Sequence, residues 1–488
     1  MSIGSFVKRI QDITRKDAGI NGDAQRIEQM SWMLFLKIYD SKEKNWEIEE
    51  DNYTSIIPEE LKWRNWAHSK KGEQVLTGND LLDFVNNKLF KELKEIEITP
   101  NMPIRKQIIK SAFEDANNYM KDGILLRQVI NVIDEVDFND PKDIHLFNDI
   151  YESILKDIQS AGNAGEFYTP RAATEFIAEI LEPKLGERIA DFACGTGGFL
   201  TSALNIMKEQ INTEKDLFDY NNAIFGIEKK AFPHLLAITN LFLHNIDDPN
   251  IIHGNSLEKN IKDYTEEDKF EIIMMNPPFG GSELDGIKNN FPQELRSSET
   301  ADLFMSVIMY RLKDNGRVGV ILPDGFLFGT GVKTIIKKKL VEEFNLHTII
   351  RLPHSVFAPY TGIHTNILFF DKTQSTKETW FYRLDMPEGY KNFSKTKPMK
   401  KEHFVPVKIW WNNRKEIVDG SFYKSKKFTP EELKKLDYNL DQCGFLEEEE
   451  EILEPKELIN QFKEKRNSYN AKMDEILSKI LEILDEDN

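Results

Sequence analysis

Four consecutive residues, Asn276, Pro277, Pro278 and Phe279, follow directly on the apolar run FEIIMM. They make a poor structural element, because proline cannot donate to a β-ladder and an amide is costly to bury at the end of an apolar strand. They fit a binding pocket better. The Asn276 side-chain oxygen and the Pro277 carbonyl can accept both hydrogens of a planar exocyclic amine, while Phe279 stacks on the ring that carries it. The segment therefore predicts a pocket in which the amine of a flat ring is made nucleophilic.

A glycine-rich segment, DFACGTGGFL, begins at Asp191 at the end of another apolar run. Gly195, Gly197 and Gly198 remove side chains where a strand turns into a helix, so a ligand can approach backbone N–H groups. This loop suits nucleotide and adenosyl cofactors alike, and a tight turn alone would also explain it. The next apolar run ends in Glu228, whose carboxylate can accept both hydroxyls of a ribose. Capping of the following helix is the alternative for Glu228.

Between residues 161 and 375, short apolar runs alternate with helical stretches, a pattern typical of a mostly parallel, doubly wound sheet. The expected strands are RIADFA, AIFGIE, NIIHGN, FEIIMM, RVGVIL, HTIIRL and TNILFF. The predicted fold class of this segment is therefore α/β with seven strands. Its chemistry-bearing segments follow the first, second and fourth of these strands.

Residues 1–160 are predicted to form an all-α N-terminal domain. A first helix is expected with Asp23 as its N-cap and with one apolar face made of Ile27, Met30, Leu34 and Ile38. Two further helical segments are expected at residues 79–89 and 144–158, and the second of them ends at the small residues SAGNAG.

The C-terminal part is predicted to comprise a polar extension, residues 376–454, and a helix, residues 455–488. The acidic run Glu447–Glu451 is expected to be a solvated linker. The helix carries an apolar seam at Tyr469, Met473, Ile476, Ile480 and Ile483. Such a seam is typical of a coiled-coil or partner-binding helix, and folding back onto its own protein is the open alternative.

Composition limits the function further. With 488 residues and 40% hydrophobic content the chain should be globular and divided into several domains. The two cysteines, Cys194 and Cys443, exclude a disulfide framework, and Cys194 is expected to be a buried thiol rather than a nucleophile. The N-terminus has no apolar signal region and no segment approaches a membrane span, so a cytoplasmic protein is expected. A net charge of −18 makes a stand-alone DNA binder unexpected unless positive charge is locally concentrated.

In this order, the segments DFACGTGGFL, IFGIE, HGNSL and NPPF resemble the motifs of S-adenosylmethionine-dependent amino-methyltransferases, and more narrowly those of the γ-class DNA adenine-N6 enzymes. Just upstream, GEFYTPR resembles the motif that covers the methionine end of the cofactor in the modification subunits of type I restriction-modification systems. The segments RIEQMSWMLFLKIYD and YTGIHTNILFF are also similar to that family. The resemblance implies a Rossmann-like methyltransferase domain between an all-α domain and a C-terminal helical region.

The resemblance also implies roles for individual residues. The catalytic motif would be Asn276 to Phe279. The cofactor, S-adenosylmethionine, would be lined by Glu166, Phe167, Tyr168, Thr169, Pro170, Arg171, Asp191, Gly195, Thr196, Gly197, Gly198 and Glu228. Asn255 and Ser256 stand near where many relatives hold the adenine amine with aspartate, so they are expected beside the cofactor despite this departure. Asp302 and Leu303 are expected to border the pocket unless they simply begin a helix, and His354 is expected to be structural.

By the same resemblance the chain would be the adenine-specific DNA methyltransferase subunit of a type I restriction-modification complex, methylating a flipped adenine. It would protect host DNA and support restriction of foreign DNA, with no metal ion in the reaction. The implied partners are a specificity subunit that recognises DNA, a second copy of the modification subunit and a restriction subunit. The rival interpretations are a methyltransferase acting on protein glutamine or RNA guanine and a catalytically inactive scaffold subunit.

Overall fold

The computed structural model describes residues 3–68, 75–99, 102–137, 168–358, 361–394, 396–420 and 422–443, together with parts of 459–473. By its internal contacts the chain divides into two compact units, residues 1–444 and 445–488. All described strands belong to the first unit.

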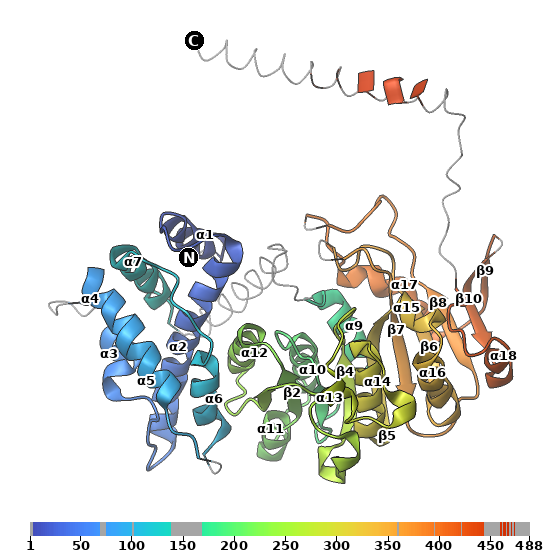
Figure 1. The fold of residues 1–488 in the computed structure, drawn as a ribbon, viewed down its shortest axis with the longest axis horizontal. Helices are drawn as coiled ribbons and strands as arrows, with labels where there is room; N and C mark the ends of the chain where they lie inside the picture. Colours follow the sequence, from blue (N-terminus) through green and yellow to red (C-terminus); the bar gives the residue numbers. More distant parts are fainter. Residues whose placement is uncertain are drawn as a thin grey trace. The chain divides into compact units, whose positions relative to one another are not determined.

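The first unit opens with helices, as predicted. They are α1 (Ile3–Thr14), α2 (Asp23–Glu49), α3 (Trp63–Trp66), α4 (Gly78–Asp83), α5 (Phe90–Glu95), α6 (Ile104–Phe113) and α7 (Gly123–Asp134), with a 3-10 turn η1 (Glu59–Leu61) and a π-helical turn η2 (Phe84–Leu89) (Figure 1). The helical prediction at residues 79–89 is thus confirmed, and the segment 144–158 lies outside the described residues.

The apolar face predicted for α2 is confirmed, because Ile27, Met30, Leu34 and Ile38 are all buried. The predicted N-cap is wrong by one position. Gly22 caps the helix with a φ of 111°, which glycine adopts without a steric penalty, and Asp23 is the first helical residue. The Asp23 carboxylate instead accepts a hydrogen bond from Arg26, one turn along the helix.

Seven strands lie where the apolar runs predict them, and they belong to one sheet. They are β1 (Ile189–Asp191), β2 (Ile224–Glu228), β3 (Ile251–His253), β4 (Phe270–Met275), β5 (Leu312–Pro323), β6 (Asn345–Arg351) and β7 (Thr365–Asp371). Their order is β3-β2-β1-β4-β5-β7-β6, and only β7 runs antiparallel to its neighbours. The doubly wound α/β class is confirmed. The edge at which β1, β2, β4, β5 and β6 end is called the carboxyl edge below.

Helices cover both faces of this sheet. They are α9 (Arg171–Leu181), α10 (Gly198–Lys208), α11 (Glu214–Asn221), α12 (Ala231–Leu243), α14 (Thr300–Arg311), α15 (Asp324–Phe328) and α16 (Val332–Glu342), with the short α13 (Asp285–Lys288) in a loop. Ile272 and Met274 of β4 enter the core that contains residues of α9, α10 and α12. Ile273 and Met275 enter the core that contains residues of α14 and α16. Side chains of a strand alternate between faces, so a strand covered on both sides reads as an unbroken apolar run.

The sheet does not stop at residue 375. Three further strands, β8 (Thr379–Arg383), β10 (Phe422–Phe428) and β9 (Ile417–Asp419), continue it beyond β6, accompanied by helices α17 (Val405–Asn412) and α18 (Pro430–Lys435). The expected seven-stranded sheet therefore has ten strands, and much of the expected polar extension is part of it. The sequence FYKSKKF concealed β10, because only Ser425 and Phe428 of this strand are buried.

Helix α12 joins the N-terminal helices to the sheet. The buried Phe242 ring lies 6.2 Å from Phe35, 6.1 Å from Tyr39 and 6.3 Å from Trp46 of α2, measured between ring centroids. Just beyond this helix, Asp247 forms an ion pair with Lys42 at 2.8 Å. Aromatic packing and charge together fix α12 against the N-terminal helices.

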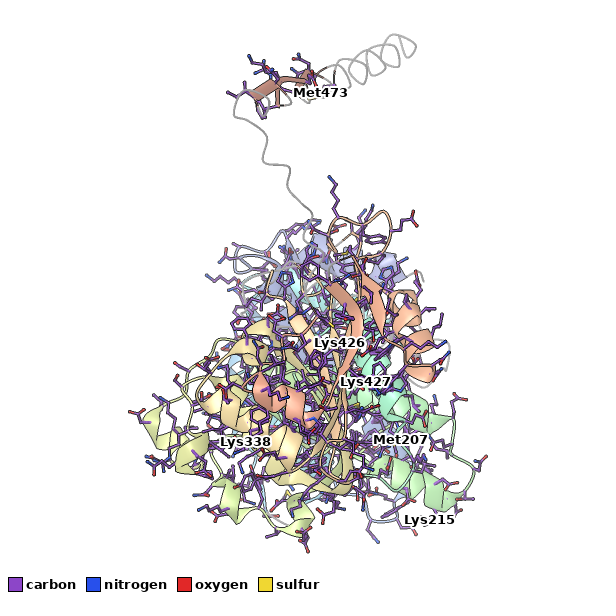
Figure 2. All side chains as sticks on the ribbon, turned by 90° about the vertical axis from the view of Figure 1, so that its right-hand side faces the viewer. Met207, Lys215, Lys338, Lys426, Lys427 and Met473 are labelled. Carbon is purple, nitrogen blue, oxygen red and sulfur yellow. The ribbon has the colours of Figure 1, made fainter. Side chains whose placement is uncertain are left out.

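None of the described helices is both long enough and apolar enough to span a bilayer. In the second unit, Ile459, Phe462 and Met473 are 55%, 66% and 60% exposed, and Figure 2 marks Met473. The other residues of the expected seam, Tyr469, Ile476, Ile480 and Ile483, lie outside the described residues.

Candidate active site

A pocket opens at the carboxyl edge, where Asp191 ends β1 and Asn276 follows β4, the strand beside it. It is lined by Tyr168, Thr169, Thr174, Asp191, Ala193, Cys194, Gly195, Thr196, Gly198, Phe199, Pro233, Leu236 and Asn276. The pocket thus brings together four separate segments of sequence. Three of these segments, around Tyr168, Gly195 and Asn276, are the predicted site motifs.

The glycine loop turns sharply from β1 into α10. Gly195 and Gly197 have φ values of 53° and 78°, in the left-handed region that favours glycine. Gly197 is the N-cap of α10, and its N–H donates to the Cys194 carbonyl at 2.8 Å. A Cβ atom on Gly198 would lie 3.1 Å from the Arg171 guanidinium. The loop therefore needs its glycines and presents a helix N-terminus to the pocket.

Glu228 lies beside this loop and is held by backbone groups. Its Oε2 accepts the Gly195 N–H at 2.8 Å and its Oε1 accepts the Lys230 N–H, also at 2.8 Å. Burial raises the pKa of the Glu228 carboxyl. Lys230 is the N-cap of α12, so Glu228 stabilises the turn that leads into this helix. This role is similar to the alternative in which Glu228 caps the following helix. Its bond to Gly195 also ties the end of β2 to the glycine loop.

Asp191 is 1% exposed, and its Oδ1 accepts the Ala193 N–H at 3.0 Å. Burial raises the pKa of Asp191 to about 8, with a smaller contribution from the charge of Glu228. Asp191 therefore shapes the loop from inside the protein.

We expect the Asp191→Asn variant to lose part of the pH dependence of stability. The native chain keeps the Asp191 proton up to a pKa of about 8, whereas an unfolded aspartate releases its proton near pH ~3.9. Between these values the unfolded state binds fewer protons, so the free energy of unfolding falls as pH rises, by at most ~1.4 kcal/mol per pH unit. Urea unfolding of both proteins at several pH values in this window measures the difference. Equal slopes would contradict this expectation.

Asn276 has one satisfied and one unsatisfied polar atom. Its Nδ2 donates to Thr169 Oγ1 at 3.1 Å, which joins the segment before α9 to the end of β4. Its Oδ1 is buried and has no hydrogen-bond partner in the described protein. The following Pro277 is buried and Pro278 is exposed. The motif therefore holds a rigid amide whose oxygen remains able to accept a hydrogen bond.

Phe279 is half-buried, and its ring lies 6.3 Å from that of Phe357 at an angle of 81°. The loop after it is tied down, because Ser282 forms a β-bridge with Glu299 and the Thr300 N–H donates to the Gly281 carbonyl at 3.0 Å. The ring of Phe279 is thus packed on Phe357, and the loop that follows it is anchored to the start of α14.

Asp302 and Leu303 are buried and do not line the pocket. The Asp302 carboxylate accepts from Ser297 Oγ at 2.7 Å and from Lys333 Nζ at 3.0 Å. Helix α14 begins at Thr300, so the helix-start interpretation of these residues fits the structure better. His354 is hydrogen-bonded to Asn392 at 2.5 Å, which agrees with its expected structural role.

Residues 168–171 lead into α9 beside the pocket. Tyr168 and Thr169 line it, and Arg171 donates to the Gly198 carbonyl at 3.1 Å and to Thr201 Oγ1 at 2.9 Å. Arg171 therefore braces α9 against α10 and does not line the pocket. Pro170, the N-cap of α9, does not line the pocket either. Glu166 and Phe167 lie outside the described residues.

Asn255 and Ser256 are not brought into the pocket. The buried Ser256 hydroxyl donates to the Phe192 carbonyl at 2.5 Å, and Asn255 Oδ1 accepts the Leu257 N–H at 3.1 Å. Both side chains hold the turn after β3, and this geometry gives no support to their expected cofactor contact.

Pocket residues without a predicted role come mainly from the first two turns of helices. Pro233 and Leu236 lie in the first turns of α12, and Thr174 and Phe199 lie in α9 and α10. Pro233 and Leu236 could have been predicted, because α12 begins directly after the strand that ends in Glu228. Cys194 is buried as predicted, and burial raises the pKa of its thiol well above the ordinary value.

Comparison with known proteins agrees with this architecture. A family model described as N-6 DNA Methylase matches residues 142–452, and one described as HsdM N-terminal domain matches residues 3–133. The chain is 54% identical over 415 residues to the EcoEI type I restriction enzyme methylase subunit of Escherichia coli, covering 85% of this chain and 84% of that relative.

Solved structures agree as well. A chain from a study of complex assembly and conformational transition of the type I R-M system matches with a TM-score of 0.80 and 34% identity, covering 98% of both chains. The type I restriction-modification methyltransferase subunit from Streptococcus thermophilus shares the fold, with a TM-score of 0.63 and 20% identity over 91% of this chain and 99% of that one. The chain therefore belongs to the N-6 DNA methylases and, within them, to the methylase subunits of type I restriction enzymes.

Proposed function

We propose that this chain binds S-adenosylmethionine at the carboxyl edge and directs its methyl group to the N6 amine of an adenine extruded from DNA. Asn276 carries the proposal. Its Nδ2 is held by Thr169, and its buried Oδ1 has no partner in the described protein. Leaving a buried acceptor unsatisfied is costly, so the arrangement suits a ligand that donates a hydrogen bond, as an exocyclic amine does.

The pocket residues fit an adenosyl cofactor together with Glu228, which bonds to the glycine loop but does not itself line the pocket. Each Glu228 oxygen accepts one backbone N–H, and a carboxylate retains further lone pairs for two ribose hydroxyls. Pro233 and Leu236 offer an apolar wall for a flat base, and the glycine loop allows close approach to the backbone. When bound, S-adenosylmethionine supplies a methyl carbon on a positively charged sulfur, which makes the thioether a good leaving group.

The chain's own groups then orient and polarise the amine. Asn276 Oδ1 and the Pro277 carbonyl would accept its two hydrogens, which favours a lone pair directed at the methyl carbon. The hydrogen bond to Thr169 fixes the amide so that Oδ1 remains the accepting atom. Phe279, packed on Phe357, would stack on the extruded base. Orientation and polarisation of this kind are worth several kcal/mol.

DNA recognition is proposed to come from a complex. A chain of net charge −18 gains little DNA affinity from long-range electrostatics. We therefore infer assembly with a specificity subunit, a second copy of this chain and a restriction subunit. Membership of the type I methylase subunits favours DNA adenine over a protein or RNA substrate.

The test is methyl transfer by the chain copurified with its specificity subunit. With tritiated S-adenosylmethionine and duplex DNA, digestion to nucleosides should place the label in N6-methyladenine. Label in another nucleoside, or in protein, would overturn the proposal.

Exchange of Glu228 for alanine should weaken S-adenosylmethionine binding by ~1 to 3 kcal/mol, the range for losing charge-assisted hydrogen bonds. Calorimetry with the purified chain measures the change. Glu209→Ala, an exposed carboxylate at the end of α10, is the matched control and should bind normally. Unchanged affinity of the Glu228 variant would remove this residue from the cofactor site.

A further inference from the structure

Positive charge is concentrated in one part of this acidic chain. Residues 386–428 contain eleven Lys and Arg and only four Asp and Glu, within a protein of net charge −18. The first part of this region, residues 386–400, has no helix or strand among its described residues and holds four lysines and one glutamate. It is called the basic loop below.

The basic loop is attached to the loop that supports Phe279. Phe357 packs on Phe279, and two residues earlier Ser355 has a φ of 60°, a conformation that non-glycine residues rarely adopt. The Ser355 hydroxyl accepts the Phe393 N–H of the basic loop at 2.8 Å. The adjacent bond from His354 to Asn392, at 2.5 Å, makes a second attachment. These contacts therefore connect the proposed base-stacking ring to the basic loop through one intervening loop.

Three lysines of the basic loop are accessible to an external anion. Lys391, Lys397 and Lys400 are exposed, and neither Lys391 nor Lys397 has a carboxylate oxygen within 4.0 Å among the described residues. Lys397 lies 5.5 Å from the Tyr390 ring, and Lys400 is 3.4 Å from Glu402 at the surface.

Other lysines of the same region are used inside the protein. Lys401 pairs with Glu179 at 2.5 Å and Lys424 with Asp385 at 2.7 Å. Lys427, marked in Figure 2, pairs with Glu378 at 3.1 Å. These lysines are therefore neutralised by carboxylates of the protein, whereas Lys391 and Lys397 are not, within the part of the chain that the structure describes.

The segment that follows Phe279 in the sequence has no comparable excess of positive charge. Residues 280–299, which follow Phe279, contain four Asp and Glu and two Lys and Arg. A phosphate backbone beside the pocket would be attracted toward the basic loop.

We propose that Lys391, Lys397 and Lys400 bind phosphates of the DNA backbone that flanks the extruded base. The proposal rests on the proposed function, since it takes DNA as the substrate. Phosphate contacts fix the register and orientation of a duplex without reading its sequence. This chain would thereby hold the backbone near its own pocket, while sequence recognition remains with the specificity subunit.

Salt dependence of DNA binding is the direct test. The triple variant Lys391→Gln, Lys397→Gln, Lys400→Gln and a control triple variant Lys184→Gln, Lys208→Gln, Lys262→Gln make the same change in net charge. The control lysines are exposed and lie toward the other edge of the sheet, at the end of α9, at the end of α10 and before β4.

Each variant is assembled with the specificity subunit, and duplex binding is measured by fluorescence anisotropy over a range of KCl concentrations. The slope of log Kd against log salt should become shallower by about 0.9 for each lost phosphate contact in the basic-loop variant, and should stay at the wild-type value in the control. Cofactor affinity should be unchanged in both. A wild-type slope in the basic-loop variant would overturn the proposal.

If the basic-loop variant fails to copurify with the specificity subunit while the control succeeds, the loop binds an acidic protein surface and the DNA proposal is wrong. Failure of the proposed function is a separate result. In that case the wild-type complex would leave DNA adenine unmethylated, whatever the salt slopes of the variants.

Discussion

Replacing Asn276 with alanine is expected to lower methyl transfer by ~100-fold or more while S-adenosylmethionine binding stays nearly intact. The substitution removes the Oδ1 acceptor and the bond to Thr169 Oγ1, and with them the orientation of the substrate amine. The glycine loop and Glu228, which are proposed to hold the cofactor, are left in place. Single-turnover methylation by the assembled complex measures the rate, and calorimetry measures the affinity.

Asn222→Ala is the matched control for this experiment, because Asn222 is an exposed amide at the end of α11. It should methylate at the wild-type rate. If the Asn276 variant also reached that rate, the amine-polarising role of this residue would be excluded. If the Asn276 variant lost both S-adenosylmethionine binding and methylation, Asn276 would instead be assigned to the cofactor site.

Removal of residues 455–488 is expected to abolish site-specific methylation while leaving cofactor binding intact. Specific DNA binding typically exceeds non-specific binding by ~10³-fold or more, and this chain is inferred to obtain that specificity from a partner. Ile459, Phe462 and Met473 are exposed apolar residues of the second unit, and an isolated helix with such a surface must bury it against something. The pocket belongs entirely to the first unit, so the truncated chain should still bind S-adenosylmethionine.

Copurification with the specificity subunit, followed by tritiated methyl transfer, measures both effects. The full-length chain alone should bind cofactor and show little site-specific methylation, as a control for the need of a partner. Robust methylation of one DNA site by the isolated chain would favour a self-sufficient enzyme. Unimpaired assembly of the truncated chain would place the partner contact elsewhere.

The positions of the candidate site motifs were readable from local sequence. FEIIMM is buried on both faces as β4, so its apolar run reveals the strand, and the residues that cannot continue a strand, Asn276 and the two prolines, mark its end. The glycines of the loop after β1 were equally visible, since Gly195 and Gly197 take left-handed conformations that few other residues adopt. Strand ends and left-handed turns constrain the residue types at their own positions, so both can be recognised from neighbouring residues in the sequence.

Strands at the far side of the sheet left a weaker signature. β10 has the sequence FYKSKKF, in which apolar and polar residues do not alternate, and it buries only two of its side chains, so it resembles an exposed segment. Its place in the sheet depends on pairing with β8, more than thirty residues earlier in the chain. The length of the sheet was therefore decided by long-range pairing.

The sequence by itself determined the α/β class, the strand ends that carry the motifs and the family to which the chain belongs. Only the tertiary structure decided which distant residues meet. Thr169 is hydrogen-bonded to Asn276, 107 residues later in the sequence. The basic loop is hydrogen-bonded to Ser355, in the loop whose Phe357 packs on Phe279. It also decided that Ser256 bonds to the Phe192 carbonyl and stays out of the pocket. The physical reason is that backbone conformation follows neighbouring residues, whereas contacts between segments follow strand order, helix packing and the satisfaction of buried polar atoms.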